Sequence, residues 1–63
     1  MTADEYRAAI SELGLSQIAA GRLLGVSPRT AQVYAAKGPS GPAAFAIRLL
    51  LATPDRDKWL SPA

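Results

Sequence analysis

Glycine and proline divide this 63-residue chain into short segments. They stand at Gly14, at Gly25, across the turn 38–42 and at Pro54. Glycine supplies the left-handed residue at which many helices end, and proline cannot continue a helix. The segments between these positions are too short for long helices and show no alternation typical of strands. The spacing therefore predicts an all-α fold of four to five short helices, with residues 1–63 forming a single domain.

Each segment begins with residues that favour a helix start. Thr2 and Glu5 have the spacing of a capping box. We predict a first helix from Ala3 to Leu13, with an apolar stripe formed by Tyr6, Ala9, Ile10 and Leu13. By the same reasoning we expect a second helix capped by Ser16 and ended by Gly25, a third over 27–37, a fourth over 42–52 and a last turn over 55–60.

The residue composition argues against catalysis. The chain has no cysteine and no histidine, so it lacks thiolate ligands, thiol nucleophiles and the commonest general base. Its carboxylates lie near the two ends of the sequence, as Asp4, Glu5, Glu12, Asp55 and Asp57. We therefore predict that the protein is not an enzyme and binds no metal ion, cofactor or small-molecule ligand.

Charge and hydropathy indicate a cytoplasmic protein with a basic middle. The start of the chain is acidic, unlike a secretory signal, and the apolar stretch 43–52 is too short to span a bilayer. Residues 13–52 contain no acidic residue, and their cations are Arg22, Arg29, Lys37 and Arg48. Such a segment suits a surface that faces a polyanion, although these cations could equally serve only solubility.

The most informative spacing lies between Gln17 and Ala36, where two short helices flank a turn at Gly25. Helix-turn-helix DNA-binding proteins have this layout. Their two helices cross steeply, so small residues are needed where the backbones approach, and we assign that contact to Ala20 and Gly21. The residues that we expect on the inner faces are Ile18, Leu24, Val26, Ala31 and Tyr34.

The segment 15–34, LSQIAAGRLLGVSPRTAQVY, resembles the Cro/repressor-like (XRE-type) helix-turn-helix family of phages and bacteria. The resemblance covers about residues 3–52 and is strongest at 16–17, 24–27 and 29–30. It implies a lambda-repressor-like domain with the helix-turn-helix unit at about 16–37. It also implies a DNA-binding transcription regulator, and members of the family are often dimeric.

On this template the helix 27–37 enters the major groove of duplex DNA. Arg29 is the first candidate for base readout because its guanidinium can donate two bonds to guanine, although it could instead contact a phosphate or remain solvated. Gln32 suits adenine, Thr30 can bond a base or a phosphate, and Val33 can pack on a thymine methyl group.

Three further residues are candidates for contacts to the DNA backbone. Gln17 and Ser27 stand at helix N-termini, where main-chain amides favour a phosphate, and the alternative role for Ser27 is capping alone. Lys37 closes its helix and could reach a phosphate or only stabilise the helix C-terminus. We expect Tyr34 to pack in the core and not to stack on bases, because stacking sites present several aromatic rings.

The fourth helix is apolar nearly all round, which indicates burial on more than one side. We predict that segment 42–60 forms a homodimer interface and pairs two recognition helices on a palindromic operator. The alternative is that residues 53–63 fold back over the same face. The predicted interface residues are Phe45, Leu49, Leu50, Trp59 and Leu60.

The function that these patterns favour is a sequence-specific, duplex-DNA-binding transcription regulator, most simply a nucleoid-associated repressor that acts as a homodimer. The alternative is a protein-interaction module on a helix-turn-helix scaffold without sequence-specific DNA binding. A membrane-surface peptide is disfavoured because the fourth helix has only Arg48 on its polar side.

Overall fold

Helices account for all the regular structure in residues 1–60, the part of the chain that the computed structural model describes, apart from the side chain of Trp59. This confirms the predicted all-helical class. None of the described helices is long and apolar enough to cross a membrane. In chain order the helices are α1 (Ala3–Glu12), α2 (Gln17–Leu24), α3 (Pro28–Lys37), α4 (Gly41–Ala52) and α5 (Asp57–Leu60).

Side-chain caps set where the helices begin. The predicted capping box is present at α1, where the Thr2 hydroxyl accepts from the Glu5 amide at 3.1 Å and the Glu5 carboxylate accepts from the Thr2 amide at 2.8 Å. Ser16 and Ser27 cap α2 and α3 as predicted. Helix α4 begins one residue earlier than predicted because Ser40 also acts as a cap and accepts from the Ala43 amide at 3.3 Å.

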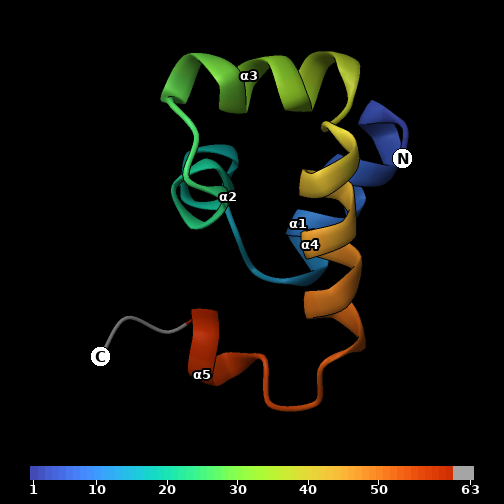
Figure 1. Ribbon diagram of the computed structural model, residues 1–63, viewed down its shortest axis with the longest axis vertical. Helices are drawn as coiled ribbons and strands as arrows, with labels where there is room; N and C mark the ends of the chain where they lie inside the picture. The colour runs from blue at the N-terminus through green and yellow to red at the C-terminus, as the bar shows by residue number, and fades with distance from the viewer. Residues whose placement is uncertain (61–63) are drawn as a thin grey trace.

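The helices enclose the core with α3 across one end of the molecule (Figure 1). Helix α4 runs along the long direction of the domain, which measures 29 × 20 × 18 Å, and α5 lies toward the end opposite α3. Helix α2 is seen nearly end-on while α3 lies in the plane of the view, so these two helices cross steeply. One full face of α3 is therefore left outside the core.

The core forms mainly around α1. The predicted stripe of α1 is buried in full, and Tyr6 and Ile47 are the largest side chains that are completely enclosed. The ring of Tyr34 packs edge-on against Tyr6, with ring centroids 6.1 Å apart and planes at 81°. Tyr34 is thus partly buried and packs against the core, which is the side on which it was predicted. The cluster consists of Tyr6, Ala9, Ile10, Leu13, Ala20 and Ile47.

The prediction for Ile18 is wrong, because its side chain is 50% exposed and not on the inner face of α2. Helix α2 instead turns Ala20 and Gly21 inward, and both are buried. At about 100° per residue, a position two residues away from Ala20 faces nearly the opposite direction. The small residues Ala20 and Gly21 occupy the inner face because larger side chains there would prevent the close approach of α3.

Candidate nucleic-acid interface

The turn between α2 and α3 depends on Gly25. This residue has φ +75° and ψ +25°, a left-handed conformation that side chains with a Cβ rarely adopt. Its amide donates to the Arg22 carbonyl at 3.1 Å, and the Val26 amide donates to the Gly21 carbonyl at 2.9 Å. These two bonds form a Schellman motif, which ends α2 and directs the chain into α3.

Helix α3 packs closely against α2 where Gly21 of α2, which has no side chain, meets Ala31 of α3. A Cβ placed on Gly21 would lie 2.6 Å from the Cβ of Ala31, closer than real carbon atoms approach. Ala31 is itself buried, with 1% of its surface exposed. The predicted small contact at Gly21 is therefore present, and it fixes how far α3 stands from α2.

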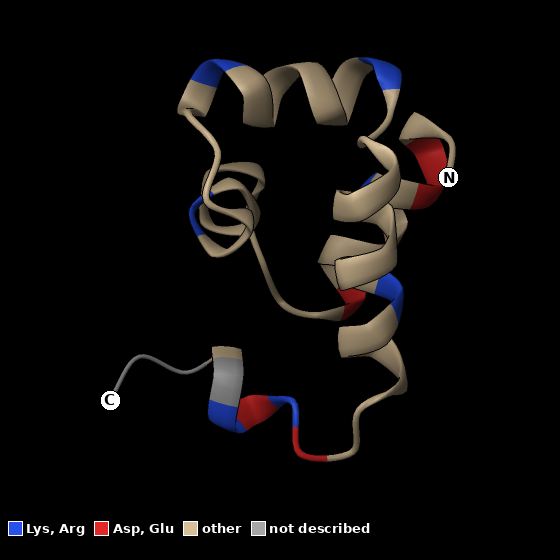
Figure 2. Cartoon of the chain, in the orientation of Figure 1, with Lys and Arg blue, Asp and Glu red and all other residues tan. Residues whose placement is uncertain are grey.

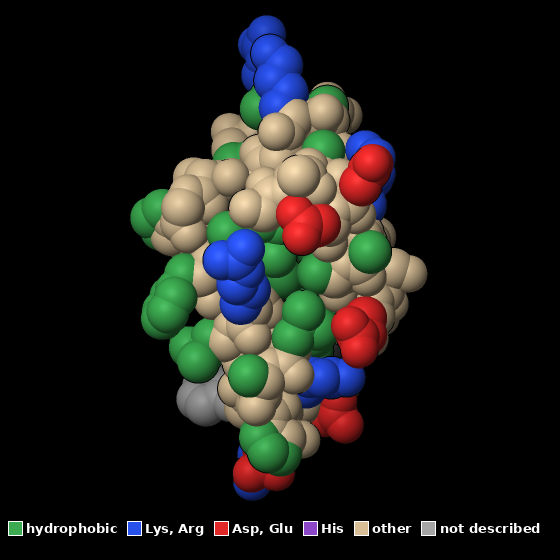
Figure 3. All heavy atoms as spheres, turned by 90° about the vertical axis from the view of Figure 1, so that its right-hand side faces the viewer, with side chains coloured by type: hydrophobic (Ala, Val, Ile, Leu, Met, Phe, Trp, Pro, Cys, Tyr) green, Lys and Arg blue, Asp and Glu red, His purple; other side chains and the backbone are tan. Residues whose placement is uncertain are grey.

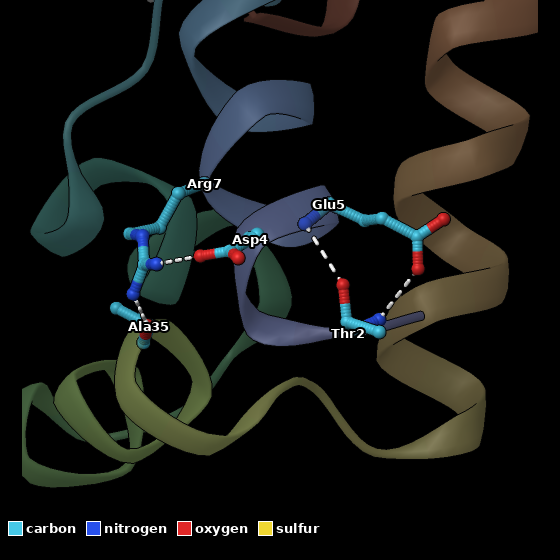
Figure 4. A network of polar contacts seen from close by, with 5 residues as sticks. All are labelled: Thr2, Asp4, Glu5, Arg7 and Ala35. Carbon is cyan, nitrogen blue, oxygen red and sulfur yellow. Dashed lines mark hydrogen bonds and ion pairs between the residues drawn. The ribbon is translucent and has the colours of Figure 1, made fainter.

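A second contact holds the C-terminal end of α3 (Figure 4). The Arg7 guanidinium on α1 donates to the Ala35 carbonyl at 2.6 Å and also pairs with Asp4. Four residues after Ala35 stands Pro39, which has no amide proton to offer this carbonyl. Arg7 therefore satisfies an acceptor that the helix leaves open, and its charge suits a helix C-terminus.

The outer face of α3 carries most of the predicted base contacts. Arg29, Gln32 and Val33 are exposed, with Val33 at 45%, and they share one side of the helix with Lys37. Thr30 is partly buried on the flank of this face. Among the described residues, no hydrogen bond or ion pair engages the side chains of Arg29, Gln32 and Lys37. Their donors are free to meet a ligand. We call Arg29, Gln32, Val33 and Lys37 the α3 face.

The charge on α3 is of one sign (Figure 2). Arg29 stands in the first turn and Lys37 in the last, and the helix has no acidic residue. Eight residues of helix separate these two cations by about 12 Å along the axis. The acidic residues Asp4 and Glu5 lie on α1, in its first turn. The α3 face thus offers two separated positive charges to a polyanion.

Ser27 and Thr30 form hydrogen bonds with each other. The Ser27 hydroxyl accepts from the Thr30 amide and donates to the Thr30 hydroxyl, each at 3.2 Å. Ser27 therefore caps α3, which was the predicted alternative to a phosphate contact. Because the Thr30 hydroxyl accepts this bond, it can still donate its own proton to an acceptor such as a phosphate oxygen. Gln17, the remaining candidate for a phosphate contact, is exposed at the first position of α2.

Two cations on the helices that pack against α3 were not singled out from the sequence. Arg22 is exposed on α2, and its only signal in the sequence was membership of the basic segment. Arg7 supports α3 through its bond to Ala35, a residue 28 positions away. No local sequence pattern could have predicted the bond between Arg7 and Ala35.

The predicted dimer residues fall into two groups. Phe45 and Leu49 are exposed on α4, by 68% and 57%, and the described side chains of residues 53–60 leave them uncovered. Leu50 and Leu60 are partly buried and pack against the core of the same chain. Trp59 lies outside the described side chains.

The described residues contain no group of three or more His, Cys, Asp or Glu side chains placed to hold a metal ion. Searches with family models, among curated proteins and among solved structures found no match to this chain. What the protein does therefore has to be inferred from its own residues and geometry.

Proposed function

We propose that the protein is a sequence-specific, duplex-DNA-binding transcription regulator of the lambda-repressor-like helix-turn-helix kind. In this proposal α2 and α3 form the helix-turn-helix unit, and α3 enters the major groove. The observation that carries the proposal is the α3 face, where Arg29, Gln32 and Lys37 stand exposed with their donors unengaged among the described residues.

The roles within the site follow from side-chain chemistry. Arg29 near the start of α3 can donate two bonds to a guanine edge, and Gln32 can both donate to and accept from adenine. Val33, one residue further on, offers a methyl surface to thymine. Lys37, Gln17 and the Thr30 hydroxyl supply contacts to phosphates, which set the register of the protein on DNA without selecting a sequence.

The proposal extends to a homodimer that represses transcription from a palindromic operator within the nucleoid of a bacterium or phage-infected cell. Two copies related by a two-fold axis would place their α3 helices about 34 Å apart, one turn of DNA. A protein-interaction module remains the second candidate, and the exposed apolar side chains of α4 favour it.

The first experiment is selection of bound sequences from random duplex DNA at about 0.15 M salt. We expect an enriched palindrome with half-sites one turn apart. Weak and uniform retention of all sequences would reject sequence-specific binding and support the protein-interaction module.

Substitutions then test the residue roles on the selected site. Arg29→Ala should cost about 1–3 kcal/mol of binding free energy and relax the preference at one base position, whereas Lys37→Ala should weaken all sequences alike. Arg48→Ala is the matched control, because it removes the same charge from an exposed position on α4. Equal losses for Arg29→Ala and Arg48→Ala would show that net charge, and not the α3 face, determines binding.

A further inference from the structure

The C-terminal end of α3 is held on both sides of Lys37 by α1 and by the chain that leads into α1. Two residues before Lys37, the Ala35 carbonyl accepts from the Arg7 guanidinium at 2.6 Å. One residue after Lys37, a Cβ placed on Gly38 would lie only 3.1 Å from the Met1 carbonyl oxygen. The backbone at Lys37 is therefore fixed, while its side chain is exposed and unpaired among the described residues.

Gly38 makes this close approach possible. It has φ +102° and ψ +154°, a conformation that residues with a Cβ rarely adopt. Its amide donates to the Tyr34 carbonyl at 2.9 Å, which closes the last turn of α3. Pro39 follows with a restricted φ and no amide proton. The chain therefore leaves α3 in one defined direction, and the last turn of the helix stays against α1.

Arg7 also determines the charge at this end of α3. Its guanidinium bridges the Ala35 carbonyl and the Asp4 carboxylate, so the carboxylate lies at the same end of α3 as Lys37 (Figure 4). The last carbonyl groups of a helix carry partial negative charge as well. Without Arg7, a polyanion that approaches Lys37 would meet the uncompensated charge of Asp4, whose side chain is 88% exposed.

The surface view agrees with this distribution of charge. On the side of the molecule shown in Figure 3, a basic side chain stands out from the end where α3 lies, and the acidic side chains all lie further from that end. The end that a polyanion would meet is thus positive, although α1 places acidic residues in its first turn nearby.

The two ends of α3 are held by different helices. The N-terminal half packs on α2, where Ala31 meets Gly21, whereas the C-terminal end is held by α1 through Arg7. Arg29, the proposed base reader, belongs to the first end, and Lys37, the proposed phosphate contact, belongs to the second. A change at Arg7 should therefore act on a contact to the DNA backbone and leave the base readout intact.

We propose that Arg7 is a positioning residue for the phosphate contact of Lys37. It holds the last turn of α3 on α1 and neutralises Asp4 beside that turn. Arg7 acts through Lys37 and does not itself touch the DNA. The inference rests on the proposed function, because it concerns how the same face binds duplex DNA.

Binding of the full chain to its selected duplex site, measured over a range of salt concentrations, tests this role. Arg7→Met should weaken binding to every sequence about three- to tenfold, leave the base preference unchanged, and reduce the slope of log K against log salt by about 0.9, the value of one phosphate contact. In a Lys37→Ala background, Arg7→Met should cost less than about twofold, because the contact that it positions is already absent.

Arg56→Met is the matched control. Arg56 donates to the Leu51 carbonyl at 3.2 Å, so this variant removes the same charge and the same kind of bond at the end of the molecule opposite α3 (Figure 1). Its loss of affinity should stay below about twofold at about 0.15 M salt, where charges further than about 8 Å apart are largely screened. Asp4→Asn keeps the bond from Arg7 and removes an acid, so it should bind at least as tightly as the parent. Circular dichroism confirms that each variant is folded at the temperature used.

Three results would overturn the inference and leave the proposed function standing, provided that the parent enriches one DNA sequence. They are an Arg7→Met variant that binds like the parent, a loss no larger than that of Arg56→Met, and losses for Arg7→Met and Lys37→Ala that add in full. Full additivity would show that Arg7 contacts a phosphate by itself. A parent that enriches no sequence and binds no duplex would refute the proposed function, and this role of Arg7 with it.

Discussion

Helices α3 and α4 lie next to each other in the chain but present outer surfaces of opposite chemistry. The outward positions of α3 are mostly polar, with Arg29, Gln32 and Lys37 around Val33. Those of α4 are mostly apolar, with Phe45 and Leu49 beside Arg48. Both helices turn alanines inward, so the requirements of the core are similar. The outward residues are not needed for the core, so they are available for contacts outside the domain.

The two helices are also held in different ways. Helix α3 is fixed by a close approach at Gly21 and by the bond from Arg7 to the Ala35 carbonyl. Helix α4 is held by larger apolar side chains, with Ile47 fully buried and Leu50 and Leu51 packed on the core. Close contact and a directional bond define a helix position more narrowly than aliphatic packing does, which suits a surface that has to match a rigid ligand.

Among substitutions that test how α3 and α4 are held, Gly21→Ala is expected to change the stability of the fold most. The added methyl would overlap Ala31, and overpacking of this kind costs about 1–3 kcal/mol. In a domain of this size we expect the melting temperature to fall by roughly 5–20 °C. Thermal unfolding followed by circular dichroism measures the change.

Two further variants establish the cause. Gly41→Ala adds the same methyl where no atom lies within 4 Å, so it should not destabilise the fold and, as a compatible glycine replacement, should stabilise it by about 0.4–1 kcal/mol. The double substitution Gly21→Ala with Ala31→Gly moves the methyl to the other helix. It exchanges one glycine inside a helix for another, so the two helix-propensity costs of about 1 kcal/mol cancel and nearly all of the loss should be recovered. A loss for Gly21→Ala no larger than for Gly41→Ala would show that α2 and α3 do not meet at this pair.

Arg7→Met tests the second support of α3. The variant keeps the aliphatic part of the side chain and removes the donor to Ala35, so we expect a loss of about 1 kcal/mol for this half-exposed group. Amide hydrogen exchange should accelerate in the last turn of α3 and not in α4. Urea unfolding gives the free energy.

The control for this variant is Asp4→Asn, which removes the exposed partner of Arg7 but leaves the bond to α3. Such surface ion pairs contribute about 0–1 kcal/mol, so the change should be the smaller of the two. Equal losses for both variants would assign the stabilisation to the ion pair and not to the carbonyl bond.

The helix boundaries were predictable from the sequence because their causes are local. Thr2, Ser16 and Ser27 cap helices a few residues away, and Gly25 ends α2 with the left-handed conformation that glycine favours. The exposed α3 face was predictable for the same reason, since the spacing within one helix determines which side chains share a side.

Contacts between distant segments were not predictable in this way. Hydrophobicity suggested that Ile18 faces inward, but the close approach of α3 gives that face to Ala20 and Gly21. The bond from Arg7 to Ala35 joins residues 28 positions apart. These features depend on the relative placement of helices, which periodicity within one helix does not contain.

The smallest effect concerns Glu5, which links the start of α1 to the charge on α4. The hydrogen bond from the Thr2 amide is the main cause that holds the pKa of Glu5 below its usual value of 4.5, and the Thr2 side chain, the chain's amino terminus and Arg48 make smaller contributions. Glu5→Gln keeps an oxygen that can accept from the Thr2 amide but removes the titration. Melting temperatures of the two proteins between pH 7 and pH 3 measure the contribution of the charge.

The direction of this effect follows from proton binding. Because the pKa of Glu5 is lower in the folded chain than in the unfolded chain, the unfolded state binds more protons near pH 4, and acid destabilises the fold. The contribution is fully present above the unfolded value and is lost as the pH falls through the folded one. The melting temperature of the parent should therefore exceed that of Glu5→Gln at neutral pH and approach it at pH 3. Parallel curves would mean that the capping hydrogen bonds, without the charge, account for the whole role of Glu5 in starting α1.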